Sequence, residues 1–551
     1  MESPIDPIDR MGTSAPIDLN EVRAKLQEKQ GPEMWRSLDE LAGTPAFQEW
    51  LHREFPRQAS EWVEPPSDGV SRRAFLQLAG ASLGLAGLTA CTKQPLERIV
   101  PYVRQPEEIV PGRALYFAST HVLSGYGYGV LAESHTGRPT KIEGNPDHPA
   151  SLGATDSFAQ ASVLDLYDPD RSQSIVNLGR IRGWGMFVQE VSPVLKALQG
   201  LGGEGLRILT GTVTSPTFAD QMKAVLAQYP RARWHRWEPA APHAEHRATV
   251  VALGAPHGRI YDLSQAKVIL TLDSDFLTDG PGSLRYAREF AKSRQVRADR
   301  KTLSRLYSIE TSPTNTGTLA DHRLALSPPE VEAFALALAA ELGAATGAPA
   351  QLSDRAKQLV TAIAKDLRAN AGASLVVADG YASESVQILA LAINEKLGNI
   401  GKTISFIKSV EADPVDQAQS LKDLVADLNA GKVELLLVLG ANPVYSAPAE
   451  LGMADAYQKA KLRIHQGLHV DETAQLSQWH IPEAHPLETW GDARAFDGTA
   501  SLIQPLIEPL YEGRSPLEVL GVLTNQVDTT AYDLVHGYWV KHLPGAASGD
   551  T

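Results

Sequence analysis

The chain has 551 residues, of which 43% are hydrophobic, and this length is enough for about two or three globular domains. Its 51 basic and 65 acidic residues give a net charge of −14, and no basic cluster has the form of a nucleic-acid-binding face. The one cysteine is Cys91, whereas iron–sulfur clusters need several thiolates and c-type haem attachment needs C-x-x-C-H. Nucleic-acid binding and redox chemistry at cysteine-bound centres are therefore excluded for this chain.

Residues 1–70 form an N-terminal extension that is far longer than the start of an ordinary export signal. Within it, apolar residues of the segment 35–56 recur at helical spacing, which predicts amphipathic helices. The apolar set is Trp35, Leu38, Leu41, Phe47, Trp50, Leu51 and Phe55. The extension is either removed with the signal or kept as a cytoplasmic tail.

Residues 71–91, SRRAFLQLAGASLGLAGLTAC, have the form of a twin-arginine export signal, with Arg72 and Arg73 as the arginine pair. The uncharged run 74–90 is short for a spanning helix, which needs roughly 20 residues. The small residues before Cys91 resemble a lipobox, so we expect acylation of its thiol after cleavage. The alternative is an uncleaved signal anchor. Both place the chain on the periplasmic side of the bacterial inner membrane, held by lipid or by the signal.

The segment 92–180 is predicted to be a small, β-containing N-terminal part. Its first portion, 92–125, is rich in proline and is expected to be irregular. Two strands should then flank a turn at 136–139, because polar and apolar residues alternate through 140–143. A short helix is expected from Phe158 to Leu166.

From residue 181 to residue 551, short apolar runs alternate with helical patterns such as 329–342 and 384–396. The clearest predicted strands are 206–210, 267–272, 374–378 and 433–439. The turns that follow them are Gly211-Thr212, Asp273-Ser274-Asp275, Asp379-Gly380 and Gly440-Ala441-Asn442-Pro443. This pattern predicts an α/β fold with Rossmann-like parallel sheets, in which ligands bind at the carboxyl ends of strands. Without G-x-G-x-x-G or a Walker pattern, ordinary βα loops are favoured over a retained nucleotide site.

The segment GRPTKIEGNPDHPASLGATDSFAQASVLDLYDPDR resembles the N-terminal part of molybdopterin oxidoreductases. In that family a Gly-x-x-Cys-x-Lys element follows, whose cysteine ligates an iron–sulfur cluster. The matching stretch here begins at Gly153, so Asp156 stands in place of the cysteine and Phe158 in place of the lysine. The segment 121–134 also lacks cysteines. The resemblance implies a retained scaffold with vestigial cluster-loop positions and no electron entry route.

A second segment, 437–520, resembles the molybdopterin-like, iron–sulfur subunit of alternative complex III, a bacterial quinol:electron-acceptor oxidoreductase. Its most specific part is WHIPEAHPLETWGDARAFDGT, and the resemblance runs from Trp35 to about Trp539. In that family a cysteine-rich, ferredoxin-like half follows the molybdopterin-like half. The chain stops at Thr551 before such cysteines, so we expect either a split gene or a truncated chain.

The resemblance implies a non-catalytic scaffold that holds no cofactor of its own. Its expected partners are integral membrane quinol-oxidising subunits, the iron–sulfur half, c-type haem subunits and membrane lipid. Iron–sulfur clusters are then expected on the companion half and haem c on partner subunits. One alternative is an active periplasmic molybdopterin oxidoreductase whose metal ligand is a Ser or Asp oxygen. Another is a free lipoprotein that binds small molecules in a cleft between α/β domains.

Several side chains between residues 480 and 492 could bind a metal or make structural contacts. The acidic and histidine residues of this group are His480, Glu483, His485, Glu488 and Asp492. Because Pro482 and Pro486 break any helix that would align them, structural hydrogen bonding is favoured over vestigial pterin contact or metal binding, and no metal site is assigned.

Aromatic and arginine side chains complete the candidate contacts. The tryptophans expected in the core or at interfaces are Trp234, Trp237, Trp479 and Trp490. The arginines expected to serve in docking are Arg323, Arg494 and Arg514.

Overall fold

The computed structural model describes residues 110, 112–241, 243–296, 302–347, 351–378, 380 and 382–543. All of them belong to one compact unit, Arg104–Thr551. The predicted helices of 35–56, the export arginines Arg72 and Arg73, and the predicted lipid attachment site Cys91 lie outside the described residues. None of the described helices is both long enough and apolar enough to cross a membrane.

The N-terminal part of the unit is a three-stranded antiparallel sheet covered by one helix. Its elements are β1 (Leu115–Leu123), β2 (Tyr126–His135), β3 (Arg138–Gly144) and α6 (Ser157–Tyr167). The turn between β2 and β3 falls at Thr136-Gly137, where both residues have positive φ, and this confirms the predicted hairpin. Strand β1 corrects the expectation of an irregular 92–125. Its polar residues Ser119 and Thr120 are buried because their hydroxyls donate to the carbonyls of Gln504 and Leu502.

A seven-stranded sheet forms the centre of the second part, with strand order β5-β4-β16-β15-β14-β6-β7. The strands are β4 (Val176–Asn177), β5 (Arg180–Ile181), β6 (Leu206–Thr210), β7 (Arg233–Arg236), β14 (Leu435–Leu439), β15 (Leu462–Gly467) and β16 (Trp479–Pro482). The five strands from β16 to β7 are parallel, and the β4–β5 hairpin adds an antiparallel edge. All five residues of β14 are buried, as expected for a central strand covered on both faces.

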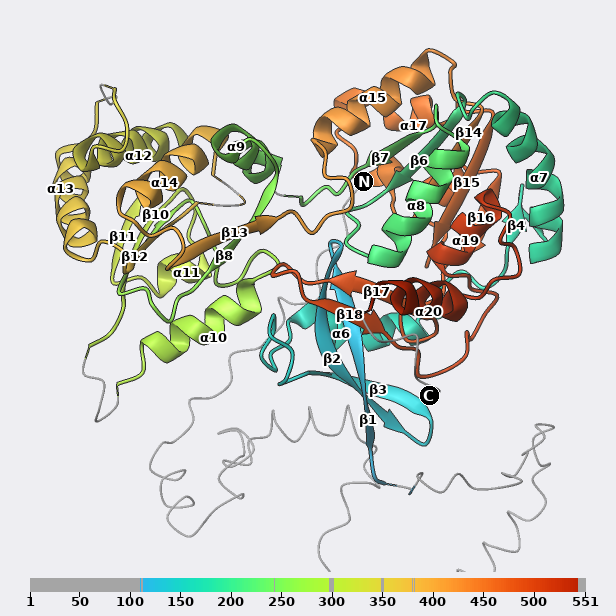
Figure 1. The fold of residues 1–551 in the computed structure, drawn as a ribbon, viewed down its shortest axis with the longest axis horizontal. Coiled ribbons are helices and arrows are strands. Elements are labelled where there is room, and N and C mark those ends of the chain that lie inside the picture. The colour runs from blue at the N-terminus through green and yellow to red at the C-terminus, as the bar shows by residue number, and fades with distance from the viewer. Residues whose placement is uncertain are drawn as a thin grey trace, which may run out of the picture. The chain divides into compact units, whose positions relative to one another are not determined.

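Helices cover both faces of this sheet (Figure 1). On one face lie α7 (Trp184–Gly200), α8 (Pro216–Gln228), α19 (Pro516–Leu523) and α20 (Ala531–His542). On the other face lie α15 (Gln417–Asn429) and α17 (Met453–Tyr457). Alternate strand residues supply the two cores, so that Ile208 and Leu437 contact the first set of helices while Leu209 and Leu436 contact the second.

A second parallel sheet, of order β11-β10-β9-β12, is inserted in the chain between β7 and β14. Its strands are β9 (Val268–Leu272), β10 (Arg305–Glu310), β11 (His322–Ala325) and β12 (Ser374–Val377). One face packs against α12 (Pro328–Leu342), α13 (Asp354–Ala369) and α14 (Glu384–Lys396), and the other packs against α10 (Ser283–Ser293). The insertion begins and ends in an antiparallel pair, β8 (His257–Tyr261) with β13 (Ile404–Lys408).

The remaining elements are α9, which packs on α14, the paired strands β17 and β18, and four short helices. They are α9 (His243–Leu253), α11 (Asn315–Thr318), α16 (Pro443–Ser446), η3 (Ala449–Leu451), α18 (Glu472–Gln475), β17 (Gly491–Arg494) and β18 (Ala500–Ile503). The four strands and two helices predicted with the clearest patterns are confirmed, with ends that differ by two residues at most. Helix α12 shows why: Ser327 and Glu330 form a capping box at its start, and Gly343 ends it in the left-handed conformation.

Candidate functional site

The carboxyl ends of β6, β14, β15 and β16 meet at one edge of the seven-stranded sheet, because these strands are parallel. In open α/β sheets this edge is where ligands bind. The predicted turns at Gly211 and Gly440 both lie there, directly after β6 and β14. We therefore take this edge as the candidate site.

Two carboxylates lie over the glycines of this edge. A Cβ atom at Gly211 would be 3.3 Å from Oε2 of Glu238, and a Cβ atom at Gly440 would be 3.5 Å from Oε2 of Glu483. Burial raises the pKa of Glu238, and burial raises the pKa of Glu483 to about 7 although Arg171 opposes this shift. The space that glycine leaves above each strand end is thus filled by an acidic side chain of the protein itself.

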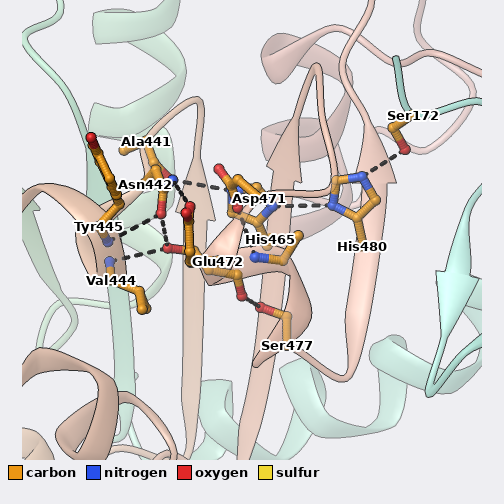
Figure 2. A network of polar contacts seen from close by, with 12 residues as sticks. Ser172, Ala441, Asn442, Val444, Tyr445, His465, Asp471, Glu472, Ser477 and His480 are labelled. Atoms are coloured by element: carbon orange, nitrogen blue, oxygen red, sulfur yellow. Dashed lines mark hydrogen bonds and ion pairs between the residues drawn. The ribbon is translucent and has the colours of Figure 1, made fainter. Parts of the chain in front are cut away.

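Two stacked histidines lie beneath the same edge (Figure 2). The rings of His465 on β15 and His480 on β16 are 5.3 Å apart and nearly parallel, and their Nδ1 atoms are separated by 3.1 Å. Nε2 of His480 pairs with the Ser172 hydroxyl at 2.7 Å, and Nε2 of His465 lies 3.2 Å from the Ala441 carbonyl. Burial lowers the pKa of each ring to about 4, so both are neutral at pH 7. The pair acts as a polar link between neighbouring strands.

The turn after β14 is held by its own side chains. Asn442 donates from Nδ2 to Oε2 of Glu472 at 2.7 Å, and its Oδ1 accepts from the hydroxyl of Thr473 at 2.8 Å and from the backbone N–H of Tyr445 at 3.4 Å (Figure 2). Asn442 is therefore the N-cap of α16. Its polar atoms are used within the protein, as an ordinary βα loop requires.

The side chains of the 480–492 group serve separate structural contacts. Glu488 forms a buried, bidentate ion pair with Arg171 (N···O 2.7 and 3.1 Å), and His485 lies 3.1 Å from the Ser162 carbonyl. Asp492 accepts hydrogen bonds from α8, and also from the indole of Trp539 at 2.8 Å. Among the described residues no group of three or more His, Cys, Asp or Glu side chains is arranged to hold a metal ion.

The strand ends of the second sheet are also acidic and satisfied internally. Asp273, directly after β9, accepts from the backbone N–H of Thr311 at 2.9 Å, and Asp275 accepts from the backbone N–H of Thr316 at 2.8 Å. Buried Glu310 at the end of β10 pairs with Arg323. Of the predicted turn at 379–380, Asp379 lies outside the described residues. This edge, too, presents carboxylates that are already paired.

The structure places Asp156 and Phe158, the two vestigial cluster-loop positions, at the start of α6. Asp156 is the N-cap of α6 and accepts from the backbone N–H of Ala159 at 2.7 Å. Phe158 is 64% exposed on the first turn of that helix. Capping explains the aspartate without any cofactor.

The tryptophans and arginines predicted to lie in the core or at interfaces differ in their burial. Trp237 and Trp479 are buried, whereas Trp234 and Trp490 are half-buried. Arg323 forms an ion pair with Glu310, and Arg494 donates to the Gly498 carbonyl at 2.9 Å. Arg514 lies over the ring of Trp184 at 4.8 Å and is partly exposed. Sequence reasoning missed Glu238 and Arg171, because each acts through a partner that is distant in the sequence.

Comparison with solved structures identifies the fold. The structure is similar to acetylene hydratase from Pelobacter acetylenicus, with a TM-score of 0.57 over 76% of this chain and 71% of that one, at 12% sequence identity. The chain has a molybdopterin-oxidoreductase-like fold. The predicted α/β class with parallel sheets is thereby confirmed.

Comparison of sequences gives a relative with a functional name. The chain is 27% identical over 493 residues to "Menaquinone reductase, molybdopterin-binding-like subunit" of Nitratidesulfovibrio vulgaris. The aligned region covers 80% of this chain and 70% of the relative. No family model matches the chain.

The fold class implies a molybdopterin cofactor, whose phosphate groups are anionic. Anions bind where backbone N–H groups and glycines at strand ends are open to the ligand. At Gly211 and Gly440 this space faces the carboxylates of Glu238 and Glu483 instead. The residues at this edge therefore do not fit the anionic part of the cofactor.

Proposed function

We propose that this chain is a non-catalytic, cofactor-free scaffold subunit of a membrane-bound respiratory quinone oxidoreductase. The similarity to a menaquinone reductase subunit supports the quinone-linked assignment. The resemblance to alternative complex III favours a more specific assignment, to a quinol:electron-acceptor oxidoreductase. Under either assignment, this chain positions neighbouring subunits that carry the redox centres.

The observation that carries this proposal is the pair of carboxylates over Gly211 and Gly440. Each of these half-buried side chains occupies the space that a phosphate group would need, and the ionised fraction of each carboxyl repels a phosphate group. The sequence adds that only Cys91 could supply a thiolate, so this chain has no set of ligands for an iron–sulfur cluster.

The location and the partners form part of the same proposal. Arg72 and Arg73 direct export of the folded chain, and a lipid on Cys91 holds it on the periplasmic side of the inner membrane. Electrons then pass from quinol through iron–sulfur clusters of a companion half to c-type haem on other subunits. The scaffold contributes fixed spacing between these centres, on which electron transfer depends.

Metal and pterin analysis of the purified assembly tests the scaffold against the alternative of an active oxidoreductase. The scaffold predicts no stoichiometric molybdenum and no pterin fluorescence after oxidation, whereas iron from clusters and haem is present. An active molybdenum enzyme with known content, purified in parallel, is the control. Stoichiometric molybdenum bound through a Ser or Asp oxygen would favour the enzyme and end the scaffold proposal.

A Cys91→Ser variant tests the anchor separately. Membranes are washed with alkaline carbonate, which removes subunits held only by protein contacts. If a lipid on Cys91 holds the chain, the washed membranes retain the unaltered chain and release the variant. If the uncleaved signal holds it, the washed membranes retain the variant too, and the role of Cys91 is refuted while the scaffold proposal stands.

A further inference from the structure

A row of hydrogen-bonded side chains, the histidine relay, runs beneath the candidate edge from Ser172 through His480 and His465 to the Ala441 carbonyl (Figure 2). Ser172 is 6% exposed, His480 is 4% exposed and His465 is fully buried. The proposed scaffold function makes no use of these groups. Because each ring nitrogen faces a partner, the partners determine which nitrogen carries a proton.

The Ala441 end of the relay fixes the proton on His465. Nε2 of His465 lies 3.2 Å from the Ala441 carbonyl oxygen, which can only accept a hydrogen bond. Nε2 must therefore be the donor and carry the proton. In a neutral imidazole the other nitrogen is then bare, so Nδ1 of His465 is an acceptor.

The direction of the remaining hydrogen bonds follows from this assignment. Nδ1 of His480 lies 3.1 Å from the bare Nδ1 of His465, so it is the donor of that pair. Nε2 of His480 is then bare, and it accepts from the Ser172 hydroxyl at 2.7 Å. Within the described residues the Ser172 hydroxyl has no other hydrogen-bond partner, which agrees with this direction. In the neutral relay every donor therefore points from Ser172 towards Ala441.

An added proton can bind at either of the two bare nitrogens. At Nε2 of His480 it is accommodated by a rotation of the Ser172 hydroxyl from donor to acceptor, and all three contacts remain. At Nδ1 of His465 it would place two N–H groups against each other, and the side-chain link between β15 and β16 would break. The first proton therefore belongs on His480.

The charges around the pair favour the same position. Burial lowers the pKa of His480, and the neighbouring His465 lowers it further, but the carboxylate of Asp471 at the start of α18 opposes both effects. Oδ2 of Asp471 lies 3.6 Å from Nε2 of His465, so it faces the pair directly. Asp471 therefore compensates part of the charge of a first proton on the relay.

Other charged side chains on the neighbouring elements already have partners. These pairs are Arg171 with Glu488, His469 with Asp168, and Glu472 with Asn442. Asp471 is therefore the group through which the surroundings act on the relay.

We propose that the histidine relay is an acid-sensitive device that responds in two steps. In the first step Nε2 of His480 binds one proton from solvent and the Ser172 hydroxyl becomes its acceptor, while no other contact changes. In the second step Nδ1 of His465 binds a proton, and the link between β15 and β16 opens. This inference goes beyond the proposed function and does not depend on it.

Nitrogen NMR of the full-length chain, with isotope-labelled histidine, tests the direction of the relay at pH 7. The signals of the two rings are identified by their loss in His465→Gln and His480→Gln variants. We expect the proton of His465 on Nε2 and that of His480 on Nδ1. A proton on Nδ1 of His465, or exchange of either ring between its two neutral forms, overturns the proposal.

Acidification of the same sample tests the order of the two steps. We expect Nε2 of His480 to become protonated while Nδ1 of His465 stays bare, and Ser172→Ala to shift this first step to lower pH by up to roughly one pH unit. Ser477→Ala is the matched control, since the Ser477 hydroxyl bonds to Tyr457 and the Thr473 carbonyl instead, and it should cause no shift. Protonation of His465 first, or equal behaviour of the two serine variants, refutes the two-step response.

Discussion

Arg171 and Glu488 form the most deeply buried ion pair of the candidate site, and their side chains are almost inaccessible to solvent. Burial alone would raise the pKa of Glu488, but hydrogen bonds from Arg171 and from the Leu510 and His485 backbone hold it below its usual value. The pair joins the 168–172 segment to the loop that contains Leu510. Removing one partner leaves the other charge buried and uncompensated.

An Arg171→Met variant should therefore lower the free energy of unfolding by about 3–5 kcal/mol. Urea denaturation at pH 7 measures this change. The exposed pair Arg294–Asp321 supplies the control, since Arg294→Met should cost no more than about 1 kcal/mol. Equal effects of the two variants would show that the buried pair is not a structural link.

The His465–His480 pair makes stability depend on pH. Their Nδ1 atoms are 3.1 Å apart, so one ring donates and the other accepts, and protonation of both rings breaks this contact. Burial lowers the pKa of each to about 4, below the unfolded value of about 6.5. Between these values the unfolded chain binds more protons, so the free energy of unfolding falls as pH drops from 6.5 to 4.

Replacing His480 by Gln should make that acid-induced loss shallower, by roughly 1.4 kcal/mol per pH unit. Urea titrations at pH 7, 6 and 5 measure the slope. Ser172→Ala, which removes only the hydroxyl partner of His480, serves as the control and should keep the slope. An unchanged slope for His480→Gln would mean that the His480 ring does not cause the acid-induced loss.

Glu483 has the opposite pH dependence. Burial raises its pKa to about 7 from an ordinary value of 4.5, so the folded chain binds more protons between these values. The free energy of unfolding therefore falls as pH rises from 4.5 to 7. Glu483→Gln should match the unaltered protein at pH 5 and exceed its stability at pH 8 by roughly 2 kcal/mol. Curves that coincide across this range would show that the pKa of Glu483 is not raised in the folded protein.

At the residue scale, the sequence predicted which side chains matter better than it predicted their partners. Structural hydrogen bonding is the favoured prediction for the 480–492 group, and His480, His485, Glu488 and Asp492 each bond separately within the protein. Its partners Ser172, Arg171, Ser162 and Thr217 lie hundreds of positions away along the chain. Such pairing depends on the folded topology, so no local pattern could reveal it.

At the element scale, the β4–β5 hairpin combines strain with exposure. Leu178 has a φ of 47° and Gly179 a φ of 75°, so a bulky residue occupies a left-handed position that Asn or Gly adopts more readily. Leu178 is also 73% exposed. Strain of this kind persists only where the surrounding structure holds the residue in place.

A Leu178→Asn variant should therefore stabilise the chain by about 1 kcal/mol, as urea denaturation can measure. Leu201, another exposed leucine, has ordinary negative φ, so Leu201→Asn is the matched control and should not stabilise the chain. Equal stability of the Leu178→Asn variant and the unaltered chain would show that the left-handed leucine is not strained.

Elements with local signals were predictable, and those that depend on distant partners were not. Strand β6 and helix α14 end where the sequence placed them, because their apolar patterns and caps are local. Strand β1 was missed because its polar residues are satisfied by the carbonyls of β18 and the residue that follows it. The antiparallel β8–β13 pair joins segments nearly 150 positions apart, and β8 carries no long apolar run.

At the scale of the whole molecule, the filled strand ends predict folding without a cofactor. A ligand present at a hundred times its dissociation constant adds about 2.7 kcal/mol of stability, which is lost when the ligand is absent. The chain produced in a host that cannot synthesise molybdopterin should therefore have the same Tm as the chain from a normal host. A molybdenum enzyme produced in both hosts is the control, and a lowered Tm for this chain would contradict the filled edge.

The antiparallel pairing of β8 with β13 has a consequence for how the molecule is built. His257 and Lys408 are cross-strand neighbours, so everything between them leaves the main body and returns to the same spot. Cutting out that excursion and closing the gap with a tight turn would leave the backbone of the seven-stranded layer continuous. The same cut would remove α14, on which α9 packs, and would uncover Ala150, Ala495 and Phe496, which share a core with the inserted sheet. A shortened, single-sheet version of the chain therefore needs α9 removed and polar residues at these three positions.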